Sequence, residues 1–580
     1  MSDTTSSGPM LAADGTPLKT SLARALRRQK LRALALIAPL LLFVVITFII
    51  PIASMLLRSV ENQIVSNTIP EATAALESWD SNSDTAPDEA VFQNLFFDLY
   101  RAAEAKEHTK LGTRLNYEQT GTSSLFRTSG RKLDKVGEEW QDPIEDIAPA
   151  LKDGETWYAI MSGTGGEAVL EARRTLWNQM VPGQFEGDVG LTLSGEIAAM
   201  LPLTTAAYAD WAIFEALEEE RDVSKRDPWE AVYAALGLDM RDADVVAAVN
   251  AYDGPHAADL QLIAANLDQL PDLTLREAFA DLDEDWLDPE VWQTIKTYSP
   301  NYTSGYFLNA VDMEKGPDGA QVRPENQQIY NKLFIRTLWM SLVITGSCII
   351  LGYPVAWLLA NLPMRTANVL MILVLLPFWT SLLVRTSAWK VLLQQQGVIN
   401  DILVWLGFVD DANRLILMNN ATGTVIAMTH ILLPFMILPL YSVMKTIPPS
   451  YLRAAKSLGA TNWTAFWRVY FPQSVPGIGA GSILVFILAI GYYITPEIVG
   501  GTDGVFISNR IAYHISSSLN WGLAAALGSI LLAVVLLLYW LYDRIVGIDN
   551  VKLGHRSIYN TTQRSVPIQR LKQTSIWLYG

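Results

Sequence analysis

Six long stretches of the sequence carry no charged residue, and they constrain the fold more than any other feature. A helix needs roughly 20 apolar residues to cross a hydrocarbon layer of about 30 Å. Because each stretch has about this length or more, the sequence predicts an all-α membrane protein with six transmembrane helices. The stretches are 33–57, 337–364, 366–384, 415–444, 469–496 and 511–542. A polar, aromatic segment at 386–396 is expected to be the interfacial end of the third helix.

Five basic residues cluster directly before the first stretch, namely Arg24, Arg27, Arg28, Lys30 and Arg32. The apolar run that follows is too long for a signal peptide and lacks a small-residue cleavage site. We therefore expect a retained anchor, with the tail 1–32 in the cytoplasm. The loop at 445–472 and the tail at 548–580 are also basic, whereas the loops expected on the outer side carry the acidic residues Asp401, Asp410, Asp411, Glu497 and Asp503. The positive-inside rule then predicts that both termini are cytoplasmic.

The segment 58–332 separates the first two stretches and differs in charge from the rest of the chain. It holds 50 Asp and Glu against 21 Lys and Arg. The rest of the chain is positively charged, so the net charge of −16 comes from this segment. Its length and its tryptophans predict an independently folded, mainly α-helical domain on the outer side of the membrane. Cap residues predict helix starts at Asp142-Pro143, Asp227-Pro228, Thr274 and Asp288-Pro289. No metal-ligand spacing or catalytic motif is apparent in it, and the only cysteine of the chain, Cys348, excludes an intrachain disulfide.

The basic loop at 445–472 has the pattern of two short helices joined by a sharp turn. Pro448 and Pro449 end the preceding span, Ser450 is a possible cap, and Gly459 stops a helix expected at 451–458. Asn462 is expected to cap a second helix that ends before Pro472. Such a knob at the cytoplasmic surface suits docking into a cleft on a partner.

The spacing within this loop resembles the EAA motif of binding-protein-dependent ABC importer permeases. Ala454-Ala455 is followed after three residues by Gly459, and after nine more by Val469-x-Phe471-Pro472. Arg453 departs from the motif, because the family usually has Glu there. The segments 337–341, 352–356, 376–386, 476–481 and 494–501 are similar to the spermidine/putrescine branch of these permeases, and the permease core is therefore expected at 333–547. The segment 58–332 lies outside this resemblance.

The resemblance implies a transport subunit of a bacterial inner membrane rather than an enzyme. In the family the loop is a coupling helix that sits in a groove of a cytoplasmic ATPase. The implied coupling residues are Arg453, Ala454, Ala455, Lys456, Ser457, Leu458, Gly459, Ala460, Phe471 and Pro472. The chain contains no Gly-Lys dipeptide and hence no phosphate-binding loop. ATP and Mg²⁺ are thus expected on an ATPase dimer, with a second permease subunit, a periplasmic solute-binding protein and the lipid bilayer as further partners, and no nucleic acid.

The solute is expected to be a polyamine or a related organic cation. Glu497, beside the outer end of the fifth stretch, is a possible counter-charge in a cavity, and Trp379, Tyr492 and Tyr493 are possible cation-π partners. Alternatively, Glu497 marks the water boundary, where it caps a helix or forms a salt bridge with Arg510. An opine, an amino-acid derivative and a phosphonate remain alternative solutes. A membrane-anchored sensor or assembly factor is a rival class, but it does not explain the loop at 445–472. A secondary transporter is a third class, for which two related halves and charges along the spans are expected, and neither is evident in the sequence.

Overall fold

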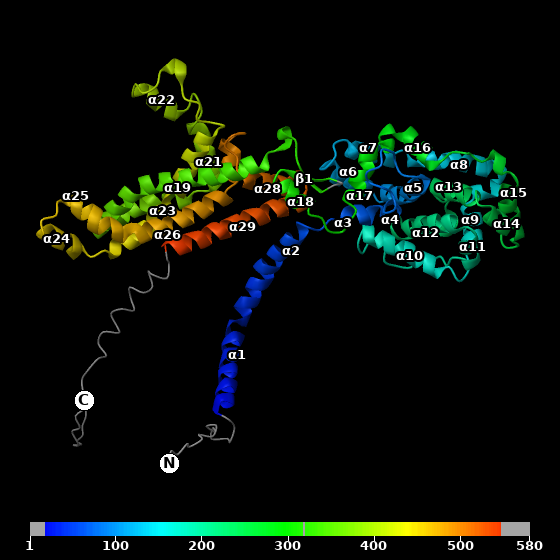
Figure 1. The fold of residues 1–580 in the computed structure, drawn as a ribbon, viewed down its shortest axis with the longest axis horizontal. Coiled ribbons are helices and arrows are strands. Elements are labelled where there is room, and N and C mark those ends of the chain that lie inside the picture. The colour runs from blue at the N-terminus through cyan, green and yellow to red at the C-terminus, as the bar shows by residue number, and fades with distance from the viewer. Residues whose placement is uncertain (1–17, 317–318, 547–580) are drawn as a thin grey trace, which may run out of the picture. The chain divides into compact units, whose positions relative to one another are not determined.

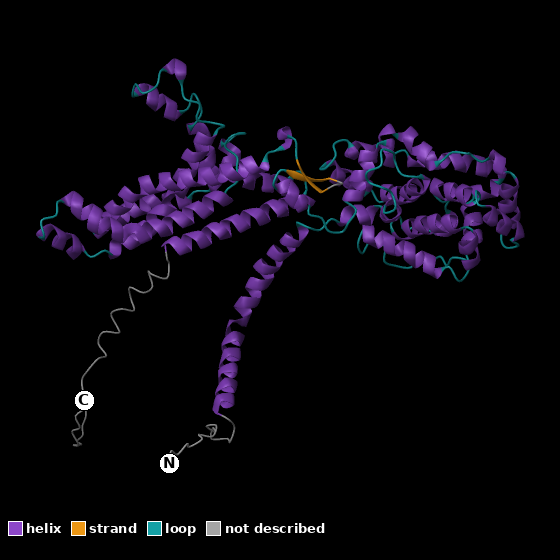
Figure 2. Ribbon diagram, viewed as in Figure 1, coloured by secondary structure: helices purple, strands orange, loops and turns teal. Residues whose placement is uncertain are grey.

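The computed structural model describes residues 18–316 and 319–546, and the chain divides into two compact units, Met1–Pro324 and Glu325–Gly580 (Figure 1). Helices make up nearly all of the regular structure in both units (Figure 2). Of the two predicted cytoplasmic tails, 548–580 and the N-terminal tail up to residue 17 lie outside the described residues.

The first unit begins with a long apolar helix, which consists of α1 (Leu18–Val44), the π-turn η1 (Val45–Ile49) and α2 (Ile50–Arg58). The π-turn precedes Pro51, which has no N–H to continue the regular hydrogen-bond ladder. Residues Leu26–Arg58 are long and apolar enough to cross a membrane, and none of the most apolar part is buried. This helix agrees with the first predicted span.

The remainder of the first unit is a helical domain, as the sequence predicts. It ends in a short antiparallel hairpin in which Met313 lies opposite Val322. Its elements in order are α3 (Gln63–Thr68), α4 (Pro70–Leu76), α5 (Glu89–Glu104), α6 (His108–Asn116), α7 (Thr122–Gly130), α8 (Leu133–Ile147), η2 (Pro149–Lys152), α9 (Gly154–Met161), α10 (Glu167–Met180), α11 (Gly195–Met200), α12 (Pro202–Leu217), η3 (Val223–Lys225), α13 (Glu230–Asp239), α14 (Ala243–Ala251), α15 (Ala257–Ala265), η4 (Leu267–Gln269), α16 (Leu275–Leu282), η5 (Glu284–Leu287), α17 (Pro289–Thr297), α18 (Gly305–Ala310), β1 (Met313–Gly316) and β2 (Gly319–Val322).

A single hydrophobic core runs through this domain from Val65 to Tyr298. Large aromatic side chains fill it and contact one another, as in the edge-to-face pair of Phe126 and Trp286 at 5.2 Å. Its fully buried tryptophans are Trp140, Trp157, Trp177, Trp211, Trp286 and Trp292. The apolar area that they remove from water is a large favourable term that offsets the strong acidity of the segment.

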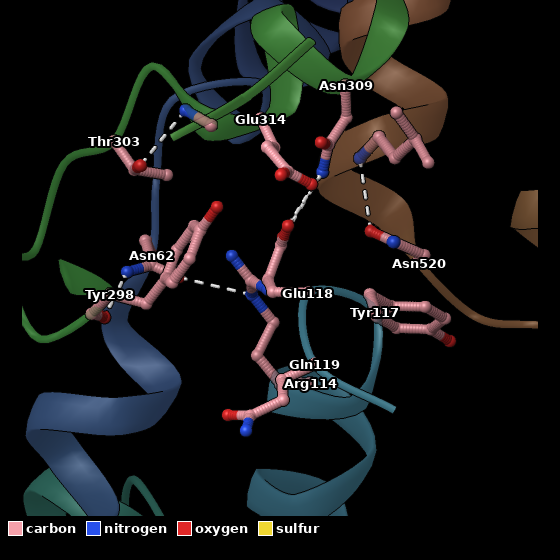
Figure 3. Close-up of polar contacts among 12 residues, drawn as sticks. Asn62, Arg114, Tyr117, Glu118, Gln119, Tyr298, Thr303, Asn309, Glu314 and Asn520 are labelled. Atoms are coloured by element: carbon pink, nitrogen blue, oxygen red, sulfur yellow. Dashed lines mark hydrogen bonds and ion pairs between the residues drawn. The ribbon is translucent and has the colours of Figure 1, made fainter. Parts of the chain in front are cut away.

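Polar contacts hold the two ends of the domain together (Figure 3). The backbone N–H of Asn62 donates to the carbonyl oxygen of Asn301 over 2.8 Å, and the Arg114 side chain donates to the Asn62 side chain over 3.2 Å. Glu118 forms ion pairs with Arg114 at 2.9 Å and with Arg323 at 3.3 Å. The first and last residues of the domain therefore lie close together, which is the geometry that an insertion between two consecutive spans requires.

The second unit is built around three helices in mutual contact, α19 (Tyr330–Asn361), α23 (Ala421–Thr446) and α26 (Phe471–Gly491). The approach of α26 to α23 is so close that a Cβ atom on Gly481 would lie 2.6 Å from the sulfur of Met436. The other elements are α20 (Met364–Leu375), η7 (Leu376–Trp379), α21 (Leu382–Leu392), α22 (Val398–Trp405), η8 (Asp411–Asn413), α24 (Pro449–Ser457), α25 (Asn462–Ala465), η9 (Phe466–Tyr470), α27 (Ile494–Val499), α28 (Ile507–Ser516) and α29 (Trp521–Val546), after the single turn η6 (Glu325–Gln327).

The described residues contain five helices that are long and apolar enough to cross a membrane, or six if one bent pair counts as a single span. The bent pair corrects the third predicted helix. Met364–Trp379 and Leu382–Leu392 meet at 95°, so 386–396 does not continue the same straight helix. Pro377 cannot donate to the ladder, and Ser381 caps a new helix by accepting from the N–H of Val384.

Two other predicted spans have different ends. The fifth, predicted to reach residue 496, ends at Gly491, because Tyr492 is extended and Pro496 belongs to the separate helix α27. The sixth, predicted from residue 511, begins at Trp521. Helix α28 ends at Ser516, and Asn520 accepts from the N–H of Leu523 at the start of α29.

Candidate functional site

The loop at 445–472 has the predicted helix-turn-helix form. Helix α24 is followed by Gly459, which has a φ of +88°, and then by α25. The predicted caps are wrong by a few residues. Pro448 precedes α24 in place of Ser450, and the hydroxyl of Thr461 rather than Asn462 accepts from the N–H of Thr464 over 3.2 Å. Because most side chains adopt a positive φ only at a cost, glycine suits this turn.

No residue of α24 is buried, and its outer face is both apolar and basic. Leu458 is 89% exposed and Tyr451 is 51% exposed. The other predicted coupling residues that are exposed are Arg453, Ala454, Lys456, Ser457, Gly459 and Pro472. Leu458 is the C-cap that follows the last residue of α24, and together with Tyr451 it exposes apolar surface at this helix.

The exposure pattern distinguishes the two adjacent alanines. Ala455 is half-buried on the same face as Leu452, which packs against the helix core, whereas Ala454 faces outward. A bulky side chain at Ala455 would therefore press α24 away from its own chain. Ala454 and Leu458 lie one turn apart and form the outward face.

Aromatic side chains fix the second half of the loop to the helix core. Trp467 contacts Phe471 at 4.8 Å and Phe466 at 5.4 Å between ring centroids. The ring of Tyr353, on α19, lies 5.8 Å from that of Phe471, and its hydroxyl is 2.9 Å from the hydroxyl of Ser474. The rings of η9 thus pack against α26, and α26 packs against α19 at Tyr353.

The residues predicted for the solute pathway fall on two parts of the second unit. Trp379 lies in η7 and is 78% exposed. Tyr493 and Glu497 lie together at α27, where the side-chain amide of Asn509 donates to the carboxylate of Glu497 and to the carbonyl oxygen of Tyr493. Tyr492 is half-buried beside them. The ring contacts of the described residues do not join Trp379 to either tyrosine.

The alternative reading makes Glu497 a boundary residue that caps a helix or pairs with Arg510, and the ion pairs of the described residues do not include this pair. The guanidinium of Arg510 instead lies 5.7 Å from the ring centroid of Tyr513. Glu497 is exposed in the first turn of α27, where the helix dipole favours a negative charge.

Sequence reasoning missed a polar group on α21 and α23. The indole N–H of Trp389 donates to Nδ1 of His430 over 3.0 Å, and Arg385 lies one turn before Trp389 on α21. In the sequence, the signal for this group is Arg385, the charged residue that directly follows the third apolar stretch.

The family match to known proteins lies within the second unit. Residues 349–546 match the family described as binding-protein-dependent transport system inner membrane component. The spermidine/putrescine transport system permease protein PotB of Salmonella typhimurium is 36% identical over 222 residues, which cover 38% of this chain and 77% of that protein. PotB of Escherichia coli is 35% identical over 222 residues, which cover 38% of this chain and 80% of that protein.

Among solved structures, a bacterial alginate ABC transporter in complex with an alginate pentasaccharide-bound periplasmic protein is similar to this chain. The sequence identity is 18% and the TM-score is 0.32, with 37% of this chain and 77% of that chain covered.

Proposed function

Because this chain belongs to the inner-membrane permeases of binding-protein-dependent ABC importers, of the polyamine type, we propose that its loop at 445–472 couples an ATPase to movement of its spans. Members of this family are non-catalytic subunits, and ATP is hydrolysed on a separate chain. The observation that carries the proposal is the exposed helix α24, which is anchored through η9 to α19 and α26. Closure of the ATPase would move this knob, and the packed rings would pass the movement to the helices.

The partners follow from this role. A dimer of ATPase subunits, which binds ATP and Mg²⁺, docks on α24 from the cytoplasm, and a periplasmic binding protein delivers the solute on the other side. A second permease subunit completes the pathway. Nucleotide and loaded binding protein then bias one equilibrium between inward-open and outward-open states.

The proposed orientation places both termini in the cytoplasm and the acidic domain in the periplasm. The basic residues near α24 and before the first span support this orientation through the positive-inside rule. The adjacent ends of the acidic domain support its placement as an insertion between the first two spans.

For the solute we propose a polyamine or a related organic cation. The spermidine/putrescine relatives support this choice, and so does the exposed group of Tyr493 and Glu497, which offers a carboxylate and a ring face to an ammonium ion. An opine, an amino-acid derivative or a phosphonate is the second candidate, because a cationic side chain, Arg385, lies within the same unit.

Recovery of the ATPase with this chain tests the proposal. Ala454→Trp adds bulk to the outward face of α24 and is expected to lower both ATPase recovery and ATP-driven uptake at least tenfold. The matched control is Ala388→Trp, because Ala388 is also an exposed helical alanine of the second unit but lies on α21. Wild-type ATPase recovery and uptake with Ala454→Trp would show that α24 is not the docking element.

A further inference from the structure

One candidate span of this chain is broken. Helix α20 with η7 meets α21 at 95°, and Ser381 starts α21 as its cap. In a membrane, non-helical backbone is tolerated only where protein covers it or where it lines a water-filled cavity. Broken helices in transporters accordingly mark solute pathways. The break at Thr380 and Ser381 thus indicates that the start of α21 faces protein or the pathway rather than lipid.

Arg385 lies in the first turns of α21, next to this break. Its side chain is half-buried, and its Nε atom is enclosed without a hydrogen-bond acceptor in the described part of the chain. The ion pairs of the described residues do not include Arg385, although Arg336 and Arg414 in the same unit each have a carboxylate partner. A guanidinium inside a membrane protein requires a counter-charge or water.

Polar and aromatic groups lie near Arg385, and the described part of the chain places no carboxylate within ion-pair distance of it. Trp389, one turn further on the same face, donates to His430 on α23 over 3.0 Å. Arg385 lies near both His430 and Tyr492. The adjacent Thr386 hydroxyl lies 3.2 Å from that of Thr495 on α27, so α21 is fixed against its neighbours at this level. The side chains near the start of α21 therefore include a guanidinium, an indole, an imidazole and a phenol, with no carboxylate within ion-pair distance of Arg385 in the described part of the chain.

We propose that Arg385 binds a carboxylate, or a similar oxyanion, which this chain does not supply and which enters from the open side of α21 during transport. Guanidinium pairs with such groups through two parallel hydrogen bonds, and an enclosed position strengthens them. The oxyanion belongs either to the solute or to the second permease subunit. A polyamine has no such group, so a polyamine transporter would obtain it from the second permease, whereas an opine would bring its own.

This inference rests on the proposed transport function, and the test uses the whole transporter. The chain is expressed with its ATPase, second permease and binding protein, and the complex is reconstituted in proteoliposomes. Uptake of spermidine and of octopine is measured for Arg385→Gln, Arg385→Lys and the wild type, together with recovery of the second permease. Lys390→Gln is the matched control, because Lys390 is an exposed cation on the same helix.

We expect Arg385→Gln to reduce uptake at least tenfold, Arg385→Lys to restore part of it, and Lys390→Gln to match the wild type. If the solute supplies the oxyanion, octopine uptake falls because its half-saturation concentration rises. Recovery of the second permease is then unchanged. If the second permease supplies it, its recovery falls as well. Wild-type uptake and recovery with Arg385→Gln would overturn the proposal. A wild-type chain that recovers no ATPase would instead overturn the transport function on which it rests.

Discussion

At the scale of single residues, the acidic domain contains a buried ionic cluster with an excess of carboxylates. Arg101 pairs with Asp98 and Asp210, and Arg173 pairs with Asp210 and Glu71. Three carboxylates therefore face two guanidiniums. Burial, the largest cause, raises the pKa of Asp98 from 3.8 to about 7, and the nearby guanidiniums compensate only in part.

This pKa predicts how the stability of the domain depends on pH. Between about pH 4 and 7, folded Asp98 keeps a proton that the unfolded chain has lost, so the free energy of unfolding falls as pH rises through this range. We expect the segment 59–324 to melt at a higher temperature at pH 5 than at pH 8. Asp98→Asn should flatten this dependence, whereas Asp142→Asn, at an exposed site, should not. Equal pH dependence in both variants would contradict the raised pKa.

Glu497 gives a test of the solute class. Glu497→Gln keeps an oxygen that can accept from Asn509 but removes the charge. We expect the half-saturation for spermidine uptake to rise about tenfold, because the loss of a counter-charge near the pathway weakens cation binding. Asp503→Asn, at an exposed carboxylate paired with Arg336, is the control. Unchanged kinetics with Glu497→Gln would make Glu497 a boundary residue.

At the scale of elements, the turn at Gly459 can be separated from general effects of glycine replacement. Gly459 has a φ of +88° and Gly407 a φ of +75°, and a Cβ atom on either would meet no neighbour. Alanine at each position should therefore carry a similar strain of about 1 to 2 kcal/mol. We expect Gly459→Ala to lower ATPase recovery several-fold and Gly459→Pro to abolish it, while Gly407→Ala leaves it unchanged. Equal recovery in all variants would show that the turn does not position α24.

The sequence predicted helix starts well where the cap is local. Thr274 and Glu277 form a reciprocal capping box, and Asp288 accepts from the N–H of Glu290. The prediction of a helix start at Asp142-Pro143 was wrong, because Pro143 lies inside α8. The buried side chains of Trp140 and Ile144 keep this helix continuous. At Asp227-Pro228 the helix begins only at Glu230. Tertiary packing overrides a local stop signal in the first case and delays the start in the second.

The candidate site shows the same division between local and tertiary information. Residue spacing was enough to predict the helix-turn-helix of the loop at 445–472, because glycine and proline fix its ends locally. It did not predict which alanine faces outward, since that depends on the packing of Leu452 against the helix core. The bend at Ser381 and the pairing of Trp389 with His430 also arise from contacts between distant segments.

At the scale of the whole molecule, the acidic domain should fold without the spans. Its core forms one cluster from Val65 to Tyr298, and its own side chains hold its two ends together. The isolated segment 59–324 is expected to give a helical circular dichroism spectrum and one cooperative thermal transition. A coil-like spectrum with a gradual transition would show that the domain depends on the rest of the chain.

The proposed coupling role requires α24 to contact the ATPase, and cross-linking tests this contact directly. Because the only native cysteine, Cys348, is buried, Leu458→Cys introduces a single accessible thiol. In intact membranes, a short thiol-reactive photo-cross-linker on residue 458 should join this chain to the ATP-hydrolysing subunit. The same reagent on Leu262→Cys, at an exposed site of the acidic domain, should not. Absence of the ATPase adduct at residue 458, or an equal yield from residue 262, would contradict the proposed coupling role.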